Sequence, residues 1–160
     1  MKKYKMTTET KVWLGRTLHR IRAIVSFGNV NAGDLGGWIE KEENLSQKGS
    51  AWVFGSAMVY DSARVCDSAR VCGSAMVDKT THYLAIGAIG SRNDVTTFFR
   101  TKDKEIFVKC GCFHGSIDDF VKAVKEKNGD TKHEKTYLLA VELAKAQIED
   151  VENGGADDGK

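Results

Sequence analysis

The chain has 160 residues, and its 24 basic and 22 acidic side chains give a formal net charge of +2 at pH 7. This length suits one ordinary domain or two to three small modules. Proteins that bind the phosphate backbone of DNA or RNA usually carry a clear basic excess. The balanced charge therefore argues against a DNA or RNA polymer as partner, and a charged ligand has to be bound by a local cluster.

No stretch of the sequence has the properties of an export or membrane segment. The N-terminal "MKKYKMTTETKVW" lacks the apolar core of a signal peptide, and no apolar run approaches the length that crosses a bilayer. We therefore expect a soluble, cytoplasmic protein in a host bacterial cytosol, with no membrane partner. Its four cysteines are expected to be reduced, because disulfides rarely persist in that compartment.

Residues 1–49 are expected to form a β-hairpin and a capping segment. In "KVWLGRTLHRIRAI", Val12 and Leu14 precede the turn residues Gly15-Arg16, and apolar and polar residues alternate after the turn, as in paired strands. Residues 28–49 contain five glycines, which predicts a compact irregular segment.

Residues 50–79 repeat one six-residue phrase five times, "SAWVFGSAMVYDSARVCDSARVCGSAMVDK". A period of six excludes a helix, because a valine at every sixth position would wander around a 3.6-residue spiral. In a strand, Ala51 and Val53 point to one face, and Trp52 and Phe54 point to the other. A short strand followed by Gly, Asp and Ser turn residues, stacked on its own copies, predicts a parallel β-helix.

The repeat resembles the hexapeptide repeat of left-handed β-helix proteins, in which three hexads form one triangular coil. The resemblance implies valines in the interior and residues 18 apart in register, so that Trp52 lies over Arg70 and Met58 over Met76. It also implies a homotrimer or a multiple of one. The outward positions are too apolar for solvent, and we expect them to form the oligomer interface: Trp52, Phe54, Met58, Tyr60 and Met76.

The periodicity changes downstream, and residues 80–150 are expected to form an α+β module. Strand-like runs at 83–89, 95–101 and 106–113 are separated by turn residues. Ser116 and Asp119 predict the start of a helix that ends at Gly129, and a second helix spans residues 131–150. Residues 151–160 are expected to be a disordered tail. The predicted fold class is mainly β with C-terminal α: an N-terminal hairpin segment, a short left-handed parallel β-helix and a ββ(β)αα module.

Two longer stretches carry further resemblances. "GNVNAGDLGGWIEKEENLSQKGSAWVFGSA" is similar to the N-terminal entry of a bacterial and prophage group of β-helix proteins described as transferases. "IGAIGSRNDVTTFFRTKDKEIFVKCGCFHGSIDDF" is similar to a segment of small phage and prophage proteins of Firmicutes. Together they imply a phage-encoded accessory protein.

The transferase resemblance raises the question of catalysis. Hexapeptide-repeat acyltransferases use a histidine on or beside the coils as general base. No histidine occurs at residues 50–79, and His82 directly follows the last hexad. His82 is compatible with an acid/base role or with an ordinary hydrogen-bonded histidine, and fewer than two coils offer too short a groove for coenzyme A. We therefore expect no catalytic residues.

The cysteines are also candidate metal ligands. Cys110, Cys112 and His114 lie two apart in "CGCFH", which would place them on one face of a strand, where they could begin a zinc site. The spacing lacks a Cys-x-x-Cys knuckle, and Cys66 and Cys72 lie six apart, on different sides of the coil. We expect no metal or cofactor, and small buried cysteines.

The segment "GSRNDVTTFFR" holds the richest polar cluster. A turn at Gly90 and Asn93 can aim backbone N–H groups at an anion, arginines match phosphate oxygens, and Phe98 or Phe99 could stack on a base. An ordinary hairpin turn would also fit these residues. The candidate ligand-binding residues are Ser91, Arg92, Asn93, Thr96, Thr97 and Arg100.

These features favour a non-enzymatic, oligomeric, phage-encoded protein that sequesters a nucleotide-type immune messenger. The expected ligand is a cyclic oligonucleotide or an ADP-ribose derivative, and the role would be that of an anti-defence sponge. Two alternatives stay open. One is a direct protein-binding inhibitor of a host defence factor that uses the aromatic face of the coils, and the other is a reduced acyltransferase.

Overall fold

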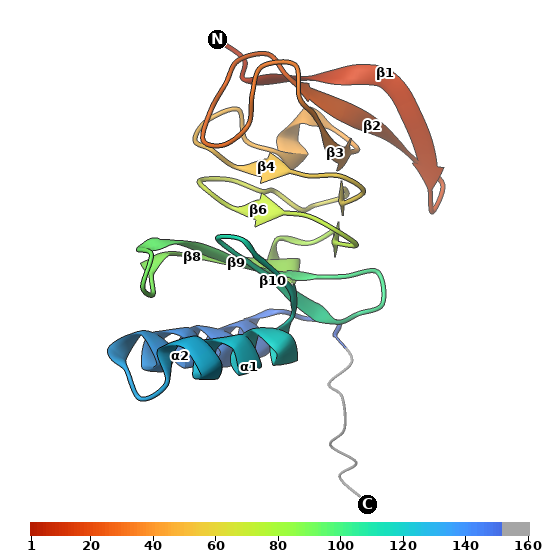
Figure 1. The fold of residues 1–160 in the computed structure, drawn as a ribbon. Helices are drawn as coiled ribbons and strands as arrows, with labels where there is room; N and C mark the ends of the chain where they lie inside the picture. The colour runs from red at the N-terminus through yellow and green to blue at the C-terminus, as the bar shows by residue number, and fades with distance from the viewer. Residues whose placement is uncertain (152–160) are drawn as a thin grey trace, which may run out of the picture.

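The computed structural model describes residues 1–151. It is mainly β with two C-terminal helices, and its parts follow one another along one axis (Figure 1). A hairpin and loops lie at the N-terminal end, short stacked strands follow, and a four-stranded sheet with two helices on its far face lies at the other end. The predicted disordered tail falls mostly on residues 152–160, outside the described residues.

The N-terminal hairpin consists of β1 (Tyr4–Trp13) and β2 (Arg16–Ala23), paired antiparallel. Leu14 and Gly15 have φ of 47° and 76°, the left-handed values of a two-residue hairpin turn. β2 also pairs antiparallel with β3 (Leu35–Ile39). The hairpin is thereby continuous with the stacked strands, in one five-stranded sheet of order β1-β2-β3-β5-β7.

Residues 35–79, called the coil stack here, form three parallel ladders. β4 (Trp52–Val53) pairs with β6 (Arg70–Val71), and β5 (Met58–Val59) pairs with β7 (Met76–Val77). A bridge between Leu45 and Val65 forms the third ladder. The predicted 18-residue register, with Trp52 over Arg70 and Met58 over Met76, is confirmed.

The interior of the coil stack is filled as the repeat predicts. Every repeat alanine and valine has at most 2% of its surface exposed. The stack also begins earlier than the hexads, because β3 pairs in parallel with β5, with Trp38 opposite Met58. The interpretation of residues 28–49 as an irregular segment is therefore wrong in part. This first coil is 20 residues long and contains a short 3-10 helix, η1 (Glu42–Asn44). Its sequence therefore does not show the period of six.

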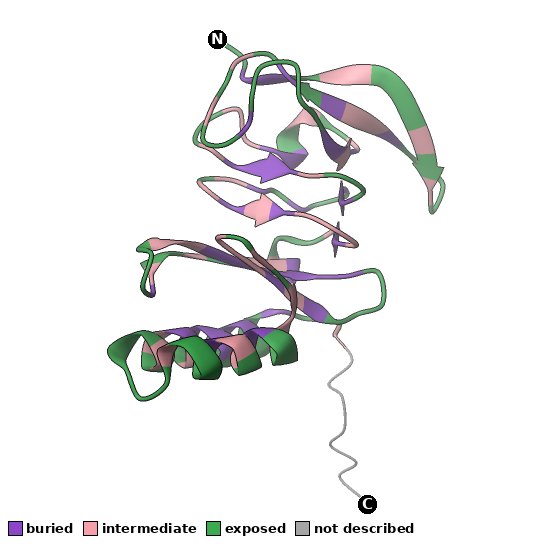
Figure 2. Cartoon of the chain, in the orientation of Figure 1, coloured by how far each residue is buried: buried purple, intermediate pink, exposed green. Residues whose placement is uncertain are grey.

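The apolar positions expected to face a partner subunit are covered by the chain itself (Figure 2). Trp52 is 1% exposed and packs edge-on against Tyr4, 6.0 Å between ring centroids, and Phe27, 5.4 Å. Three more of these positions, Met58, Tyr60 and Met76, are buried in a cluster with Leu18 of β2. The fifth, Phe54, is partly buried. The apolar character of these positions is thus explained by cover within one chain, which corrects the reason for placing an interface there.

The C-terminal module has four strands in the order β11-β10-β9-β8. After a 3-10 turn, η2 (Thr80–His82), come β8 (Tyr83–Ile89), β9 (Asp94–Arg100), β10 (Ile106–Cys110) and β11 (Phe113–Ser116). The third predicted run, 106–113, is thus two strands joined by a turn at Gly111-Cys112. Gly111 has φ of 56°.

Both predicted helices are present, and the second ends at Gln147, three residues before its expected limit at residue 150. α1 (Ile117–Asn128) begins after Ser116, whose side chain accepts a hydrogen bond from the Asp119 amide, and α2 (Lys132–Gln147) begins after Thr131. Neither helix, among the residues described, is long and apolar enough to cross a membrane.

The C-terminal sheet lies between the coil stack and the helices. Successive side chains of β9 point to opposite faces of the sheet, so β9 packs against both. Phe99 packs with the interior of the coil stack, whereas Phe98 packs with the helices. The Arg70 amide donates to Thr97 Oγ1 at 3.0 Å, and the Lys102 amide donates to the Ser74 carbonyl at 3.0 Å. The sheet therefore closes the open end of the coil stack.

Candidate functional site

A cavity of about 300 Å³ lies in the C-terminal module, where the β8–β9 loop and the β10–β11 turn meet the helices. Its residues come from segments far apart in the sequence. Figure 1 shows the β8–β9 loop and the α1–α2 connection on the same side of the molecule. We call this the C-terminal cavity. It is lined by Ser91, Arg92, Cys110, Cys112, Phe113, Phe120, Ala123, Val124, Lys127, Asn128 and Tyr137.

Aromatic side chains form much of the cavity wall. Phe120 of α1 lies between the other two rings, with its centroid 5.2 Å from that of Phe113 and 5.5 Å from that of Tyr137. Such tilted and edge-on arrangements are the preferred geometries of aromatic pairs. Burial raises the pKa of Tyr137, with a further contribution from the Cys110 thiol, so the phenol is neutral and can act as a hydrogen-bond donor near pH 7.

Two cations stand at the cavity, on separate elements. Arg92 is exposed in the β8–β9 loop and lies across the β10–β11 turn, so that a Cβ on Gly111 would be 3.2 Å from Arg92 Nε. Lys127 is exposed in the last turn of α1. Neither side chain makes a hydrogen bond or an ion pair with another described residue, and the cavity lining contains no Asp or Glu. The cavity lining therefore carries two positive charges that no described carboxylate compensates.

Glycine is required where the loop reaches α2. Gly90 has φ of 72°, and a Cβ there would collide with the Tyr137 phenol. Asn93, at φ of 47°, closes the same turn. This close approach places Ser91 and Arg92 at the cavity.

The structure brings together only part of the predicted ligand-binding set. Ser91 and Arg92 line the cavity, and Asn93 shapes their loop. Thr96 is buried and reaches the cavity through Cys110, since Thr96 Oγ1 donates to the Cys110 Sγ at 3.3 Å. Thr97 faces the coil stack, where its hydroxyl accepts from the Arg70 amide.

Arg100 lies away from the cavity. It ends β9, whereas Arg92 precedes β9, and seven residues of extended strand span about 20 Å. Its guanidinium is 3.4 Å from Asp78 Oδ1 and donates to the Asp150 carbonyl at 3.4 Å. The structure therefore does not bring Arg100 together with the other predicted ligand-binding residues, because Arg100 contacts Asp78 and Asp150 at the far end of β9.

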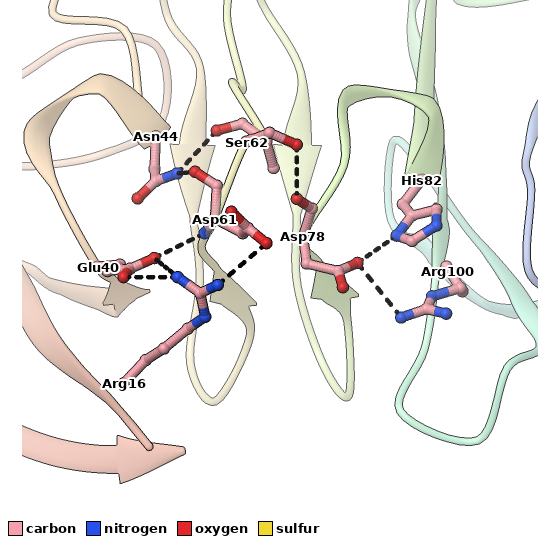
Figure 3. Close-up of polar contacts among 9 residues, drawn as sticks. Arg16, Glu40, Asn44, Asp61, Ser62, Asp78, His82 and Arg100 are labelled. Atoms are coloured by element: carbon pink, nitrogen blue, oxygen red, sulfur yellow. Dashed lines mark hydrogen bonds and ion pairs between the residues drawn. The ribbon is translucent and has the colours of Figure 1, made fainter. Parts of the chain in front are cut away.

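His82 lies close to two carboxylates, those of Asp78 and Asp150, and Figure 3 shows its contact with Asp78. Its side chain is 1% exposed, and Nδ1 is 2.5 Å from Asp78 Oδ1, although not in hydrogen-bonding direction. Nε2 is 3.2 Å from Asp150 Oδ2. Both ring nitrogens thus face acidic side chains of the same chain, and neither faces the C-terminal cavity.

The three residues considered as a zinc site are separated by the turn at Gly111-Cys112. Cys110 and Cys112 line the cavity, whereas His114 stacks on Phe99 at 6.3 Å and contacts Phe107 at 5.8 Å, on the side of the coil stack. Among residues 1–151, no group of three His, Cys, Asp or Glu side chains is arranged to hold a metal ion.

Seven cavity residues were missed by sequence reasoning: Phe113, Phe120, Ala123, Val124, Lys127, Asn128 and Tyr137. Phe120 and Tyr137 belong to the apolar stripes of the predicted helices, but a stripe does not say that a cavity remains beside it. Lys127 and Asn128 carry no local signal, because their role depends on where α1 ends relative to a loop about 35 residues earlier.

Comparison with known proteins gives a limited result. No family model matches the chain. The chain is similar to a protein of Escherichia coli (strain K12) described as the uncharacterized acetyltransferase YdcK, with 34% identity over 62 residues. The alignment covers 34% of this chain and 19% of that protein. The chain therefore spans about a fifth of the length of the curated relative it matches.

Proposed function

We propose that the chain is a binding protein that sequesters a small nucleotide-type anion in the C-terminal cavity. The observation that carries the proposal is a cavity whose described lining holds no carboxylate. In it Arg92 and Lys127, which pair with no other described residue, stand beside an aromatic wall. Arg92 can offer two parallel N–H donors to a phosphate, and Lys127 adds a mobile ammonium. Apolar rings suit the flat base of such a ligand.

Binding without turnover fits these surroundings better than catalysis. The lining holds no histidine and no carboxylate that could serve as general base. His82, the acid/base residue of the acyltransferase alternative, is buried and surrounded by Asp78 and Asp150. A substrate would have to displace one of these carboxylates before it could exchange a proton with the ring.

The proposal also includes the handedness of the coil stack, the oligomeric state and the biological role. We infer that the coil stack is a left-handed β-helix, supported by its three parallel ladders and its alanine and valine interior. A homotrimer stays a prediction, now without the support of the apolar coil positions. A phage-encoded, cytoplasmic anti-defence role depends on the bound nucleotide being an immune messenger.

Mass spectrometry of small molecules released from the purified protein by heat tests the proposal. We expect an unchanged nucleotide from the wild type and a strongly reduced amount from Arg92→Ala. Arg64→Ala, which removes an exposed arginine of the coil stack, is the matched control and should retain the ligand. A chemically converted ligand, or equal amounts from both variants, would contradict sequestration at this site.

Acetyl transfer is the second candidate, because the E. coli protein similar to part of this chain is described as an acetyltransferase. Incubation with acetyl-CoA and amine or hydroxyl acceptors should release no free thiol if the chain only binds. Turnover that His82→Gln abolishes in a folded protein would favour the transferase.

A third possibility, direct inhibition of a host protein, loses its expected surface. It relied on exposed aromatic side chains of the coils, and Trp52 and Tyr60 are buried. Co-purification of a host protein that is lost on substitution of Trp52 or Tyr60 in a folded variant would restore it.

A further inference from the structure

The volume of the C-terminal cavity indicates the size of ligand that this cavity can enclose. About 300 Å³ is the lower end of the range for ligand pockets, which runs to about 1,000 Å³. A single base with its sugar is of this scale. A macrocycle of two or three nucleotides is larger than the space, and it would have to leave a base outside.

The cavity is also divided by polarity. Phe120 and Tyr137 are buried, and with Phe113 they form the apolar part. Arg92 and Lys127 are exposed, so their charges lie on the side of solvent. A ligand with a flat apolar end and a charged end can satisfy both parts in only one direction.

The number of cations matches one short phosphate group. Arg92 offers two parallel N–H donors that one phosphate can accept, and Lys127, on α1, adds a single point charge at the same cavity. Arg100 contributes nothing here, because it lies at the far end of β9, where its two Nη atoms contact the Asp150 carbonyl and Asp78.

We infer that the ligand unit is one nucleotide, with its base against the aromatic wall and its phosphate at Arg92 and Lys127. This inference rests on the proposed function and specifies which class of nucleotide is bound. Nucleoside monophosphates, diphosphates and ADP-ribose derivatives present a single terminal nucleotide of this kind. A cyclic dinucleotide carries two bases on a ring of two sugars and two phosphodiesters, which is larger than a cavity of about 300 Å³.

Calorimetry on the full-length protein, freed of any co-purified ligand, separates the possibilities. The probes are the four common nucleoside 5′-monophosphates, ADP-ribose, adenosine, inorganic phosphate and cyclic di-AMP. We expect at least one monophosphate or ADP-ribose to bind with one ligand per chain. The matching nucleoside and free phosphate should each bind at least about tenfold more weakly, because each lacks one half of the contact.

Two kinds of variant test the orientation. Arg92→Ala and Lys127→Ala should each remove most of the preference for the nucleotide over its nucleoside, by about tenfold or more. Ala123→Leu places a larger side chain in the wall and should weaken nucleotide and nucleoside alike. Arg64→Ala is the control, and circular dichroism and the melting temperature verify that each variant is folded.

The outcomes distinguish this inference from the proposed function. If one cyclic di-AMP binds per chain and Arg92→Ala weakens that binding, the proposal of sequestration in this cavity is supported, but the single-nucleotide inference is overturned. Binding of any nucleotide that survives Arg92→Ala and Lys127→Ala together would overturn the site. If neither monophosphates, ADP-ribose nor cyclic di-AMP binds, both proposals fail.

Discussion

At the scale of single residues, surroundings decide how identical side chains behave. Cys72 is partly buried in the coil stack, and burial raises the pKa of its thiol to about 11. Cys112, at the tip of the β10–β11 turn, is exposed and lines the C-terminal cavity. Only a thiolate reacts readily with alkylating reagents, so the two cysteines differ in reactivity.

We predict that iodoacetamide at pH 8 modifies Cys112 first and Cys72 last. Peptide mass spectrometry at successive times gives the order, and unfolding in guanidinium should make the rates similar. Nucleotide binding should slow the reaction of Cys112, because the ligand would cover the cavity. Rapid modification of Cys72 in the folded protein would contradict the packing of the coil stack.

His114 provides a second residue whose surroundings shift its titration. Burial against Phe99 and Phe107 lowers the pKa of the imidazole below its ordinary value of 6.5, and the charge of Lys109 lowers it further. Well above pH 6.5 the ring is neutral in both the folded and unfolded chain. As the pH falls below 6.5, the unfolded chain takes up the proton first, so this residue makes the fold less stable.

The expected result is a smaller loss of stability between pH 6.5 and the lowered pKa in His114→Gln than in the wild type. Urea unfolding at pH 7.5 and at pH 5 measures the difference, and NMR titration of the ring gives the pKa directly. His133→Gln, on the exposed side of α2, controls for the loss of an imidazole. A pKa at or above 6.5 in the folded protein would refute the argument.

At the scale of elements, the β8–β9 loop joins the predicted cluster to the observed cavity. Gly90 has a left-handed φ and lies against the Tyr137 phenol of α2, so a side chain is excluded twice, by conformation and by contact. Gly55 is a matched case, because it has φ of 57° but a Cβ added there would meet nothing within 4 Å. The pair separates conformational strain from loss of packing.

We expect Gly55→Ala to cost about 1 kcal/mol of unfolding free energy, from the left-handed backbone alone. Gly90→Ala should cost about 3 kcal/mol, since Tyr137 must also move. It should also weaken nucleotide binding, because Ser91 and Arg92 follow directly. Equal costs in chemical denaturation would show that the contact with Tyr137 is unimportant.

The sequence predicts elements well where the signal is local. The hexads give the register of the coil stack, and Ser116 and Gly129 give the limits of α1. The first coil, residues 35–51, escapes prediction because its strand pairs with one 20 residues later and its side contains η1. The turn at Gly111-Cys112 escapes because a two-residue turn inside an apolar run looks like continuous strand.

The candidate site is predictable only in its loop. Ser91 and Arg92 are adjacent in sequence to a recognisable turn, but Lys127 and Tyr137 reach them through packing of two helices against the sheet. Arg100 shows the opposite error. An arginine in this sequence context suggests a phosphate-binding residue. Its actual partners, Asp78 and Asp150, lie 22 and 50 residues away in the sequence, and spacing alone cannot identify them.

At the scale of the whole molecule, a row of polar contacts runs along one edge of the coil stack (Figure 3). Arg16 of β2 is 2.9 Å from Glu40 and 3.1 Å from Asp61 in successive coils. The next coil contributes Asp78, whose carboxylate contacts His82 and Arg100. The row therefore links the N-terminal hairpin, the coil stack and the C-terminal sheet.

Arg100 is the last member of this row, and its replacement tests a structural role against a ligand-binding role. It is 8% exposed and joins Asp78 of the coil stack to the carbonyl of Asp150, after α2. Arg100→Met keeps much of the volume and removes the charge, leaving Asp78 with His82 alone. We expect a loss of about 2 kcal/mol in unfolding free energy, because a largely buried charge loses a partner.

Nucleotide affinity should be unchanged in folded Arg100→Met, because the side chain lies about 20 Å from Arg92 along the sheet. Arg92→Met should show the reverse pattern, with stability retained, because Arg92 is exposed and pairs with no described residue, and affinity lost. Chemical denaturation gives the stability of each variant, and calorimetry gives its nucleotide affinity. We expect Arg100→Met to lose only stability and Arg92→Met to lose only affinity. If Arg100→Met instead loses the nucleotide while keeping its stability, the phosphate is bound at the carboxylate-rich end of β9, and the assignment to the C-terminal cavity has to be abandoned.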